Sequence, residues 1–175
     1  IRDSPVTGVQ TCALPICLRY ELNKRDLDAM LISSPENRAY LSGFVGSAGY
    51  LLITKDAAVI ATDFRYVEQA KYQAPNYEVV KIGNRDQDWF AGLIQRMGIS
   101  NLGFEGDDVT VSLHERLLTK LKGLKGPDSK KTSLLSTVGI TEGIRATKEP
   151  DELSLLQKAI DIIQRLLKSN VALTT

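Results

Sequence analysis

The chain has 175 residues, of which 43% are hydrophobic and 25% charged, and its formal net charge is +1. This composition can bury a core and is too apolar for intrinsic disorder, and no apolar run reaches the ~20 residues of a membrane span. The near-neutral balance argues against nucleic-acid and membrane partners, and the single histidine, His114, excludes most histidine-based metal sites and catalytic triads.

The first sixteen residues are not expected to belong to the fold. The segment VTGVQTCALPI at 6–16 resembles the in-frame translation of a sequencing-library adapter. A signal peptide fits poorly, because the segment lacks a basic region and Pro15 interrupts its apolar stretch. We therefore interpret residues 1–16 as a disordered adapter artefact. Cys12 lies inside it and Cys17 at its junction, so no disulfide is predicted and a reducing, cytoplasmic setting is expected.

From Leu18 onward, helical and strand patterns alternate along the chain. In chain order, apolar spacing and turn residues predict a helix at 17–27, a strand at 29–32, a helix at 35–41, strands at 50–54 and 57–61, a helix at 63–74, a strand at 77–82, a helix at 86–97, a strand at 102–104, a helix at 110–121 and a strand at 133–138. Pro35 and Asp63 are predicted to begin helices, and Lys55-Asp56 to turn a hairpin. Because that hairpin makes one pair of strands antiparallel, we expect an α/β, three-layer domain with a mixed central sheet.

The last predicted helix, at 150–167, follows a linker at 145–148 and carries an apolar stripe. The stripe consists of Leu153, Leu156, Ala159, Ile160, Ile163 and Leu167. A single terminal helix cannot bury such a stripe by itself, so it either packs back on the domain or begins a second domain.

Two long motifs, SPENRAYLSGFVGSAGYLLIT at 34–54 and TDFRYVEQA at 62–70, resemble the N-terminal domain of the creatinase/prolidase family. The likeness is strongest to bacterial Xaa-Pro aminopeptidases and dipeptidases. The segments LGFEG at 102–106 and GIRATKEPDELSLLQKA at 143–159 match in the same order. The resemblance implies a ribonuclease H-like arrangement for residues 17–145. It also implies that residues 146–175 are the linker and the first helix of a metallopeptidase catalytic domain that the chain lacks.

The resemblance implies a parent protein that is a proline-specific metallopeptidase, acting on proline-containing peptides in the cytoplasm as a homodimer. Two divalent metal ions, such as manganese, cobalt or zinc, would be held in the missing catalytic domain by two Asp, one His and two Glu. No catalytic residue, metal ligand or cofactor is therefore assigned in this chain, which is not expected to be an enzyme by itself. A stand-alone binding or scaffold domain and the N-terminal part of a creatinase-like amidinohydrolase are the alternatives.

Five residues of the motifs are candidates for substrate access or dimer contact: Asn37, Tyr40, Phe44, Arg65 and Tyr66. Arg65 and Tyr66 are predicted in the first turn of their helix, where the helix dipole gives a cation no stabilisation. A solvated Arg65 on the surface is the plainer alternative. Asn37 more simply fixes a local turn, and Phe44 suits a core plug as well as a pocket wall.

Two other patterns suggest chemistry that we do not assign. The loop Gly43–Gly49 lacks the Lys-Ser/Thr of a phosphate loop and follows a helix instead of preceding one. It is interpreted as a flexible connection, and contact with substrate or a partner subunit is the alternative that the resemblance favours as an added role. Asp63, Glu105, Asp107 and Asp108 could gather as in a ribonuclease H-like nuclease. However, Asp63 is expected to cap a helix, and Asp107-Asp108 to precede one.

Overall fold

The computed structural model of the chain describes residues 14–83, 88–123, 131–148 and 150–171, which fall into two units, 14–144 and 145–171. Its elements are α1 (Leu14–Lys24), β1 (Ala29–Ile32), α2 (Pro35–Ser42), β2 (Tyr50–Thr54), β3 (Ala58–Thr62), α3 (Val67–Gln73), β4 (Glu78–Lys81), α4 (Asp88–Arg96), β5 (Asn101–Glu105), α5 (Val111–Lys122), β6 (Ser133–Thr137), α6 (Ile140–Ala146) and α7 (Pro150–Val171).

The six strands form one mixed sheet in the order β4-β3-β2-β1-β5-β6. The pairs β1–β2 and β2–β3 are antiparallel and the other three are parallel, with Leu31 of β1 opposite Leu52 of β2 and Phe104 of β5. The predicted hairpin at Lys55-Asp56 joins β2 to β3, closed by a hydrogen bond of 2.9 Å from the Thr54 N–H to the Ala57 carbonyl. The mixed sheet predicted from that hairpin is therefore confirmed.

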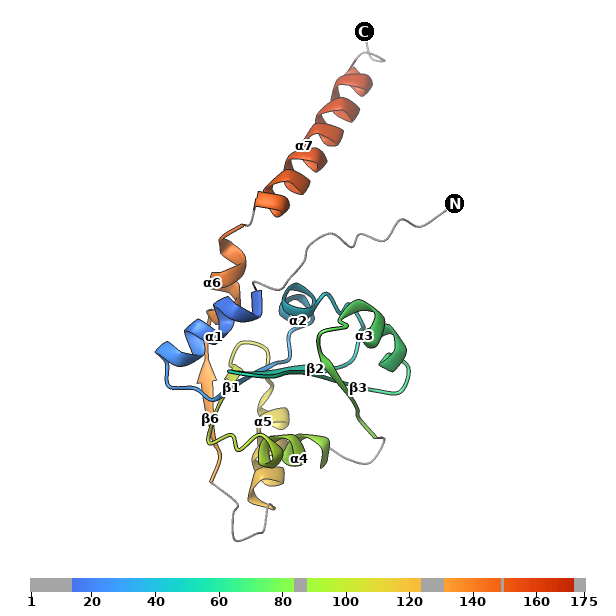
Figure 1. The fold of residues 1–175 in the computed structure, drawn as a ribbon. Coiled ribbons are helices and arrows are strands. Elements are labelled where there is room, and N and C mark those ends of the chain that lie inside the picture. Colours follow the sequence, from blue (N-terminus) through green and yellow to red (C-terminus); the bar gives the residue numbers. More distant parts are fainter. Residues whose placement is uncertain (1–13, 84–87, 124–130, 149, 172–175) are drawn as a thin grey trace. The chain divides into compact units, whose positions relative to one another are not determined.

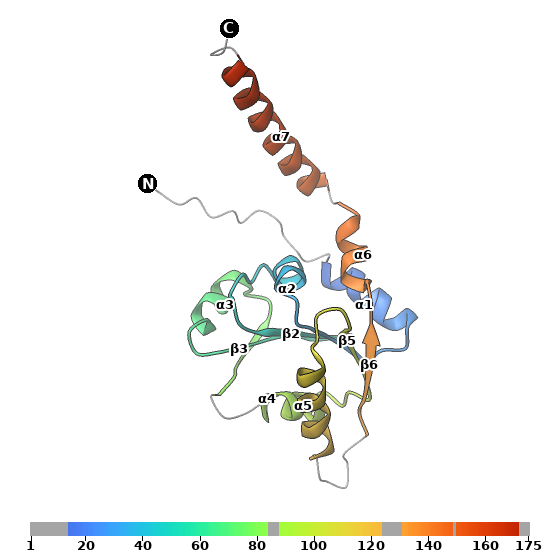
Figure 2. The same ribbon diagram turned by 180° about the vertical axis from the view of Figure 1, so that it is seen from behind.

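Both faces of the four inner strands, β1, β2, β3 and β5, are buried, so successive residues on them enter different cores. On β1, Met30 and Ile32 join a cluster with α1, α2 and α3, whereas Ala29 and Leu31 join a second cluster with α4 and α5. The two ribbon views show α1, α2 and α3 on one face of the sheet and α4 and α5 on the other (Figures 1 and 2). The prediction of a three-layer α/β domain is confirmed.

Two helices differ from the sequence-based expectation. Helix α1 begins at Leu14, inside the segment interpreted as disordered; Pro15 suits a first turn, and the fully buried Leu18 and Leu22 hold the helix on the core. Helix α6 was not expected; its seven residues are too few to show a helical period, although Ile140 is buried in the first cluster. The start of the helix predicted at 86–97 lies outside the described residues.

A buried carboxylate joins the end of β5 to the start of α2. Glu105 is 7% exposed, and its Oε2 accepts hydrogen bonds from the backbone N–H groups of Ser33 and Ser34, both at 2.7 Å. The Ser33 hydroxyl donates to the same oxygen at 3.2 Å, and Nδ2 of Asn37 donates to Oε1 at 2.7 Å. These donors offset the cost of burying the charge, and the N-terminal end of α2 favours an anion there. The start of α2 is thereby fixed to the sheet.

We expect Glu105→Gln to lower the free energy of unfolding by about 2 kcal/mol, because a neutral amide cannot accept from all of these donors. Urea denaturation measures the change. The matched control is Glu115→Gln on the exposed face of α5, expected to change stability by less than about 0.5 kcal/mol. Equal effects of the two substitutions would contradict a structural role for the Glu105 charge.

Candidate functional site

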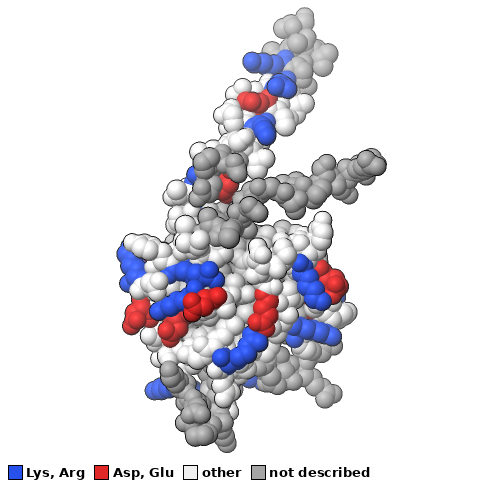
Figure 3. Space-filling model, in the orientation of Figure 1, with Lys and Arg blue, Asp and Glu red and all other residues white. Residues whose placement is uncertain are grey.

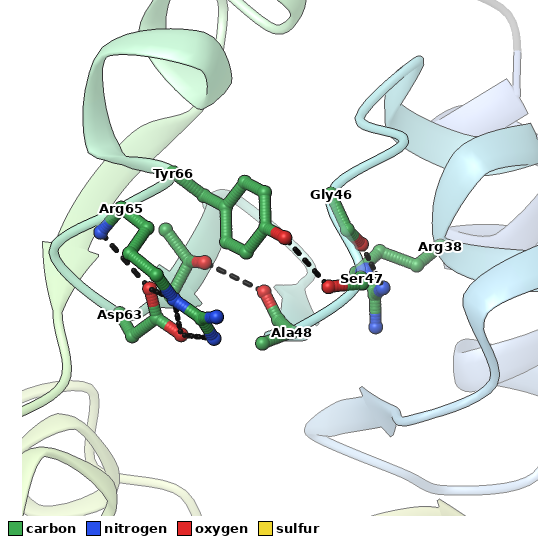
Figure 4. A network of polar contacts seen from close by, with 8 residues as sticks. Arg38, Gly46, Ser47, Ala48, Asp63, Arg65 and Tyr66 are labelled. Carbon is green, nitrogen blue, oxygen red and sulfur yellow. Dashed lines mark hydrogen bonds and ion pairs between the residues drawn. The ribbon is translucent and has the colours of Figure 1, made fainter.

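Two segments that are distant in the sequence meet at one edge of the domain, the loop Gly43–Gly49 after α2 and the turn 63–66 after β3 (Figure 4). The hydroxyls of Ser47 and Tyr66 lie 2.6 Å apart. Beside them, the hydroxyl of Thr62 donates to the carbonyl of Ala48 at 2.6 Å. We call these two segments the loop–turn edge.

Asp63 does not cap α3, so that prediction is wrong. Its Oδ1 accepts from the backbone N–H of Arg65 at 2.9 Å, and its Oδ2 pairs with the Arg65 guanidinium at 2.6 Å. This local turn satisfies the carboxylate before the helix begins, and Tyr66 takes the N-cap position with no side-chain cap bond. Arg65 and Tyr66 therefore precede the first turn of α3. Phe64, which lies within the helix predicted at 63–74, also precedes α3 and is 63% exposed.

The Arg65 side chain is held in place although it is solvent-exposed. Its guanidinium carbon lies 5.2 Å from the centre of the Tyr66 ring, a cation–π geometry, and 57% of the side chain is exposed. Its hydrogen bond to Asp63 lowers the pKa of that carboxyl, and Asp63 raises the pKa of Arg65 in turn. Because both groups face water, the pair contributes little to stability. Its effect is to orient the guanidinium.

Three further candidates remain: Asn37, Tyr40 and Phe44. Only Phe44 belongs to the loop–turn edge, and its side chain is buried beneath that edge. Phe44 is fully buried and meets the Tyr66 ring edge-on, with centroids 6.3 Å apart, so it is a core plug. Asn37 is 1% exposed, and its Nδ2 donates to Glu142 at 2.5 Å as well as to Glu105. Tyr40 is half-buried against the first core cluster. The structure thus brings together Phe44, Arg65 and Tyr66.

Sequence reasoning missed Arg38, which is 2% exposed at the base of the loop. Its Nη2 donates to the Gly46 carbonyl and its Nη1 to the Gly49 carbonyl, each at 2.6 Å, with a longer contact of 3.4 Å to the Ser33 carbonyl. Burial lowers the pKa of Arg38. The nearby carboxylates of Asp108 and Glu105 have the opposite but smaller effect on it. The sequence did carry a signal for the burial of Arg38, because a residue three positions before the apolar Leu41 lies on the same face of the helix.

The acidic residues offer no metal centre in the described part of the chain. Glu105, Asp107, Asp108 and Glu142 border a pocket of about 20 Å³, room for about one water, and two of them already accept from Asn37. No group of three or more His, Cys, Asp or Glu among the described residues could hold a metal ion. Asp63 is engaged with Arg65 instead of joining them. The residues present therefore do not fit the two implied metals or a nuclease site.

On the domain face seen in Figure 3, basic and acidic side chains are interleaved, in line with the net charge of +1. Among the described helices, none is long and apolar enough to cross a bilayer.

Comparisons with known proteins give one consistent result. Over 145 residues the chain is 32% identical to the protein named "Uncharacterized peptidase YqhT" of Bacillus subtilis, covering 83% of this chain and 39% of that protein. The structure of an Xaa-Pro dipeptidase from Bacillus anthracis superposes with a TM-score of 0.74 at 31% identity, covering 85% of this chain and 39% of that one. The N-terminal domain of the cytoplasmic peptidase PepQ from Mycobacterium tuberculosis gives a TM-score of 0.67 at 41% identity, covering 76% of this chain and 98% of that one.

The chain thus spans about two fifths, 39%, of the two longer relatives, and nearly all of the relative that is itself an N-terminal domain. Residues 17–147 match the family described as the Creatinase/Prolidase N-terminal domain, and this match covers most of the chain. The resemblance of the motifs at 34–54 and 62–70 is confirmed, and the chain belongs to the creatinase/prolidase N-terminal domain family.

Proposed function

We propose that this chain is the N-terminal, non-catalytic part of a proline-specific metallopeptidase, either an Xaa-Pro aminopeptidase or an Xaa-Pro dipeptidase. The observation that carries the proposal is the match to 39% of the Xaa-Pro dipeptidase of Bacillus anthracis through the family's N-terminal domain. The relatives are named as peptidases, which favours this activity over that of a creatinase-like amidinohydrolase.

The unit that contains α7 supports a second domain. Leu153, Leu156, Ile160, Ile163 and Leu167 recur at helical spacing along α7. An apolar stripe of this kind calls for a covering surface. The catalytic domain would supply that surface, whereas a stand-alone scaffold domain would leave the stripe in water.

The chemistry belongs to that second domain in this proposal. Two divalent ions held there would activate the water that attacks the bond before proline. The residues of this chain would not touch the reacting atoms. They would shape the entrance to the site, in a cytoplasmic homodimer in which each N-terminal domain lies near the partner's catalytic pocket.

Arg65 is the side chain best suited to that entrance. Its guanidinium can bind a carboxylate through two parallel hydrogen bonds, and the ends of short peptides carry such a group. Asp63 engages its Nε and Nη2, which leaves Nη1 without a partner among the described residues. The exposed Val45 and Phe64, 63% each, give the same edge apolar surface for a peptide or a partner subunit.

The reading frame itself tests the proposal. We expect sequencing of the source gene through codon 175 to continue into a domain with two Asp, one His and two Glu in order, and to replace residues 1–16 upstream. A stop codon directly after Thr175 would instead make this a non-catalytic module and would contradict the proposal.

In the full-length protein, we expect Arg65→Ala to lower kcat/KM for an Xaa-Pro peptide by about tenfold, mainly through KM, because a charge-assisted contact to substrate is lost. Steady-state hydrolysis of a dipeptide and a longer peptide measures this. Arg96→Ala is the matched control, since Arg96 forms an equally exposed pair with Glu78 at 2.7 Å on another edge. Unchanged kinetics for Arg65→Ala would remove Arg65 from the entrance.

The Asp63–Arg65 pair should be visible in solution. Since Arg65 holds the pKa of Asp63 below its ordinary value, the pair is intact above the ordinary pKa and is lost as pH falls through the lowered one. We expect the side-chain carbon of Asp63 to titrate below the ordinary range of an aspartate by NMR. In Arg65→Ala its midpoint should rise to the ordinary range, and identical midpoints in both proteins would show that the contact does not form.

A further inference from the structure

We propose that Arg38 is a positioning residue: it fixes the loop Gly43–Gly49, and through Phe44 and Tyr66 it holds Arg65 at the loop–turn edge. The proposal rests on the proposed function for the meaning of Arg65. The positioning itself is argued from contacts within the domain. It assigns a role to a residue on the buried face of α2 that is only 2% exposed.

The first observation is the unusual set of partners around a buried cation. Arg38 is fully buried, yet within the described residues no carboxylate lies within ion-pair distance of it. Its terminal nitrogens instead donate to carbonyls at both the middle and the end of the loop, Gly46 and Gly49. A rigid, planar fork can hold two separate carbonyls at once, which a lysine ammonium cannot do in the same geometry. The side chain therefore sets the distance between two points of the loop.

The second observation is that the loop has no slack between those points. A Cβ on Gly46 would lie 2.2 Å from the Phe44 ring, so the backbone rests directly on that ring. The Arg38 guanidinium lies 5.6 Å from the centre of the same ring. At Gly49 the φ of +146° and a distance of 2.9 Å from a Cβ to the Ala61 carbonyl exclude other residues without a shift. Arg38, Phe44 and the loop backbone thus form one packed unit.

The third observation connects this unit to Arg65. Phe44 supports the Tyr66 ring edge-on, and the Tyr66 hydroxyl bonds the Ser47 hydroxyl of the loop. The Arg65 guanidinium lies over the ring of this same Tyr66 side chain. Figure 4 shows the sequence of contacts from Arg38 through the loop to Tyr66 and Arg65. If the loop moved, Tyr66 would lose both its support and its hydroxyl partner.

Amide hydrogen exchange on the 175-residue chain tests the positioning directly. We expect Arg38→Lys, which keeps the charge and loses one of the two carbonyl contacts, to speed exchange about tenfold at residues 44–48 and at Tyr66. Exchange in β2 and β3 should change much less. The matched control is Arg19→Lys, because Arg19 also donates to a carbonyl, that of Thr54, at a distant hairpin. Unchanged exchange at residues 44–48 in Arg38→Lys, or an equal rise in the strands, would overturn the proposal.

A second variant tests the link without touching the core. Ser47→Ala removes the exposed hydroxyl that meets Tyr66, so exchange should rise at Tyr66 while Phe44 and Val45 stay protected. The Phe44 and Val45 amides donate to Ser42 and Gln73 side chains, which this substitution leaves in place. Equal protection of Tyr66 in wild type and Ser47→Ala would show that the loop does not position the turn.

Kinetics of the full-length protein then connect positioning to activity. We expect Arg38→Lys to lower kcat/KM by a factor similar to that of Arg65→Ala, and the double variant to be no worse than Arg65→Ala alone, because both substitutions remove one function. Multiplicative losses would mean that Arg38 acts on activity independently of Arg65 and would overturn the inference. If Arg65→Ala has no kinetic effect, the proposed entrance role fails, whereas the exchange data still decide whether Arg38 fixes the loop.

Discussion

Helix α2 buries two adjacent polar side chains, and the arrangement of the domain depends on where each of them finds partners. Asn37 donates to Glu105 at the end of β5 and to Glu142 of α6, the helix that follows β6. These two bonds hold the start of α2 against the ends of both strands. Arg38 donates to the carbonyls of the loop that leaves the other end of the helix. A buried amide or guanidinium without partners would cost more than most single contacts in the domain contribute. The helix is therefore fixed at both ends by hydrogen bonds that only one placement satisfies.

The same network explains why the domain has little room for a ligand of its own. Strands β1 and β5 are parallel neighbours, and the helices that follow them, α2 and α5, pack into opposite cores. Ligands commonly bind in the crevice that such a divergence opens at the carboxyl ends of strands. Here the Glu105 carboxylate occupies the place beside the α2 N-terminus, and about 20 Å³ is left beside it. This crevice is therefore too small for a peptide.

The sequence predicted most of the framework, because strands buried on both faces are short apolar runs between clear turn residues. β1 and β2 match their predicted bounds, and Pro35 and Thr110 begin or cap their helices as the residue types indicate. The errors arise where a side chain had two local options. Asp63 could cap a helix or close a turn onto Arg65, and the structure has the turn. The part played by Arg38 was beyond local reasoning, since its partners are backbone carbonyls that carry no residue-type signal.

The contrast between Arg38 and Arg65 shows how a buried side chain can order an exposed one. An exposed arginine ordinarily loses much rotamer freedom when it binds, and that loss weakens the contact. Arg65 has already lost part of this freedom, because Asp63 and the Tyr66 ring fix the guanidinium before any partner arrives. Tyr66 can do this only while the loop beneath it keeps its shape, and that shape is set by a cation buried among carbonyls. Two carbonyls of the loop thus hold the terminal nitrogens of Arg38, while its Nε has no partner among the described residues. The consequence that we propose at the surface is an oriented Arg65 side chain.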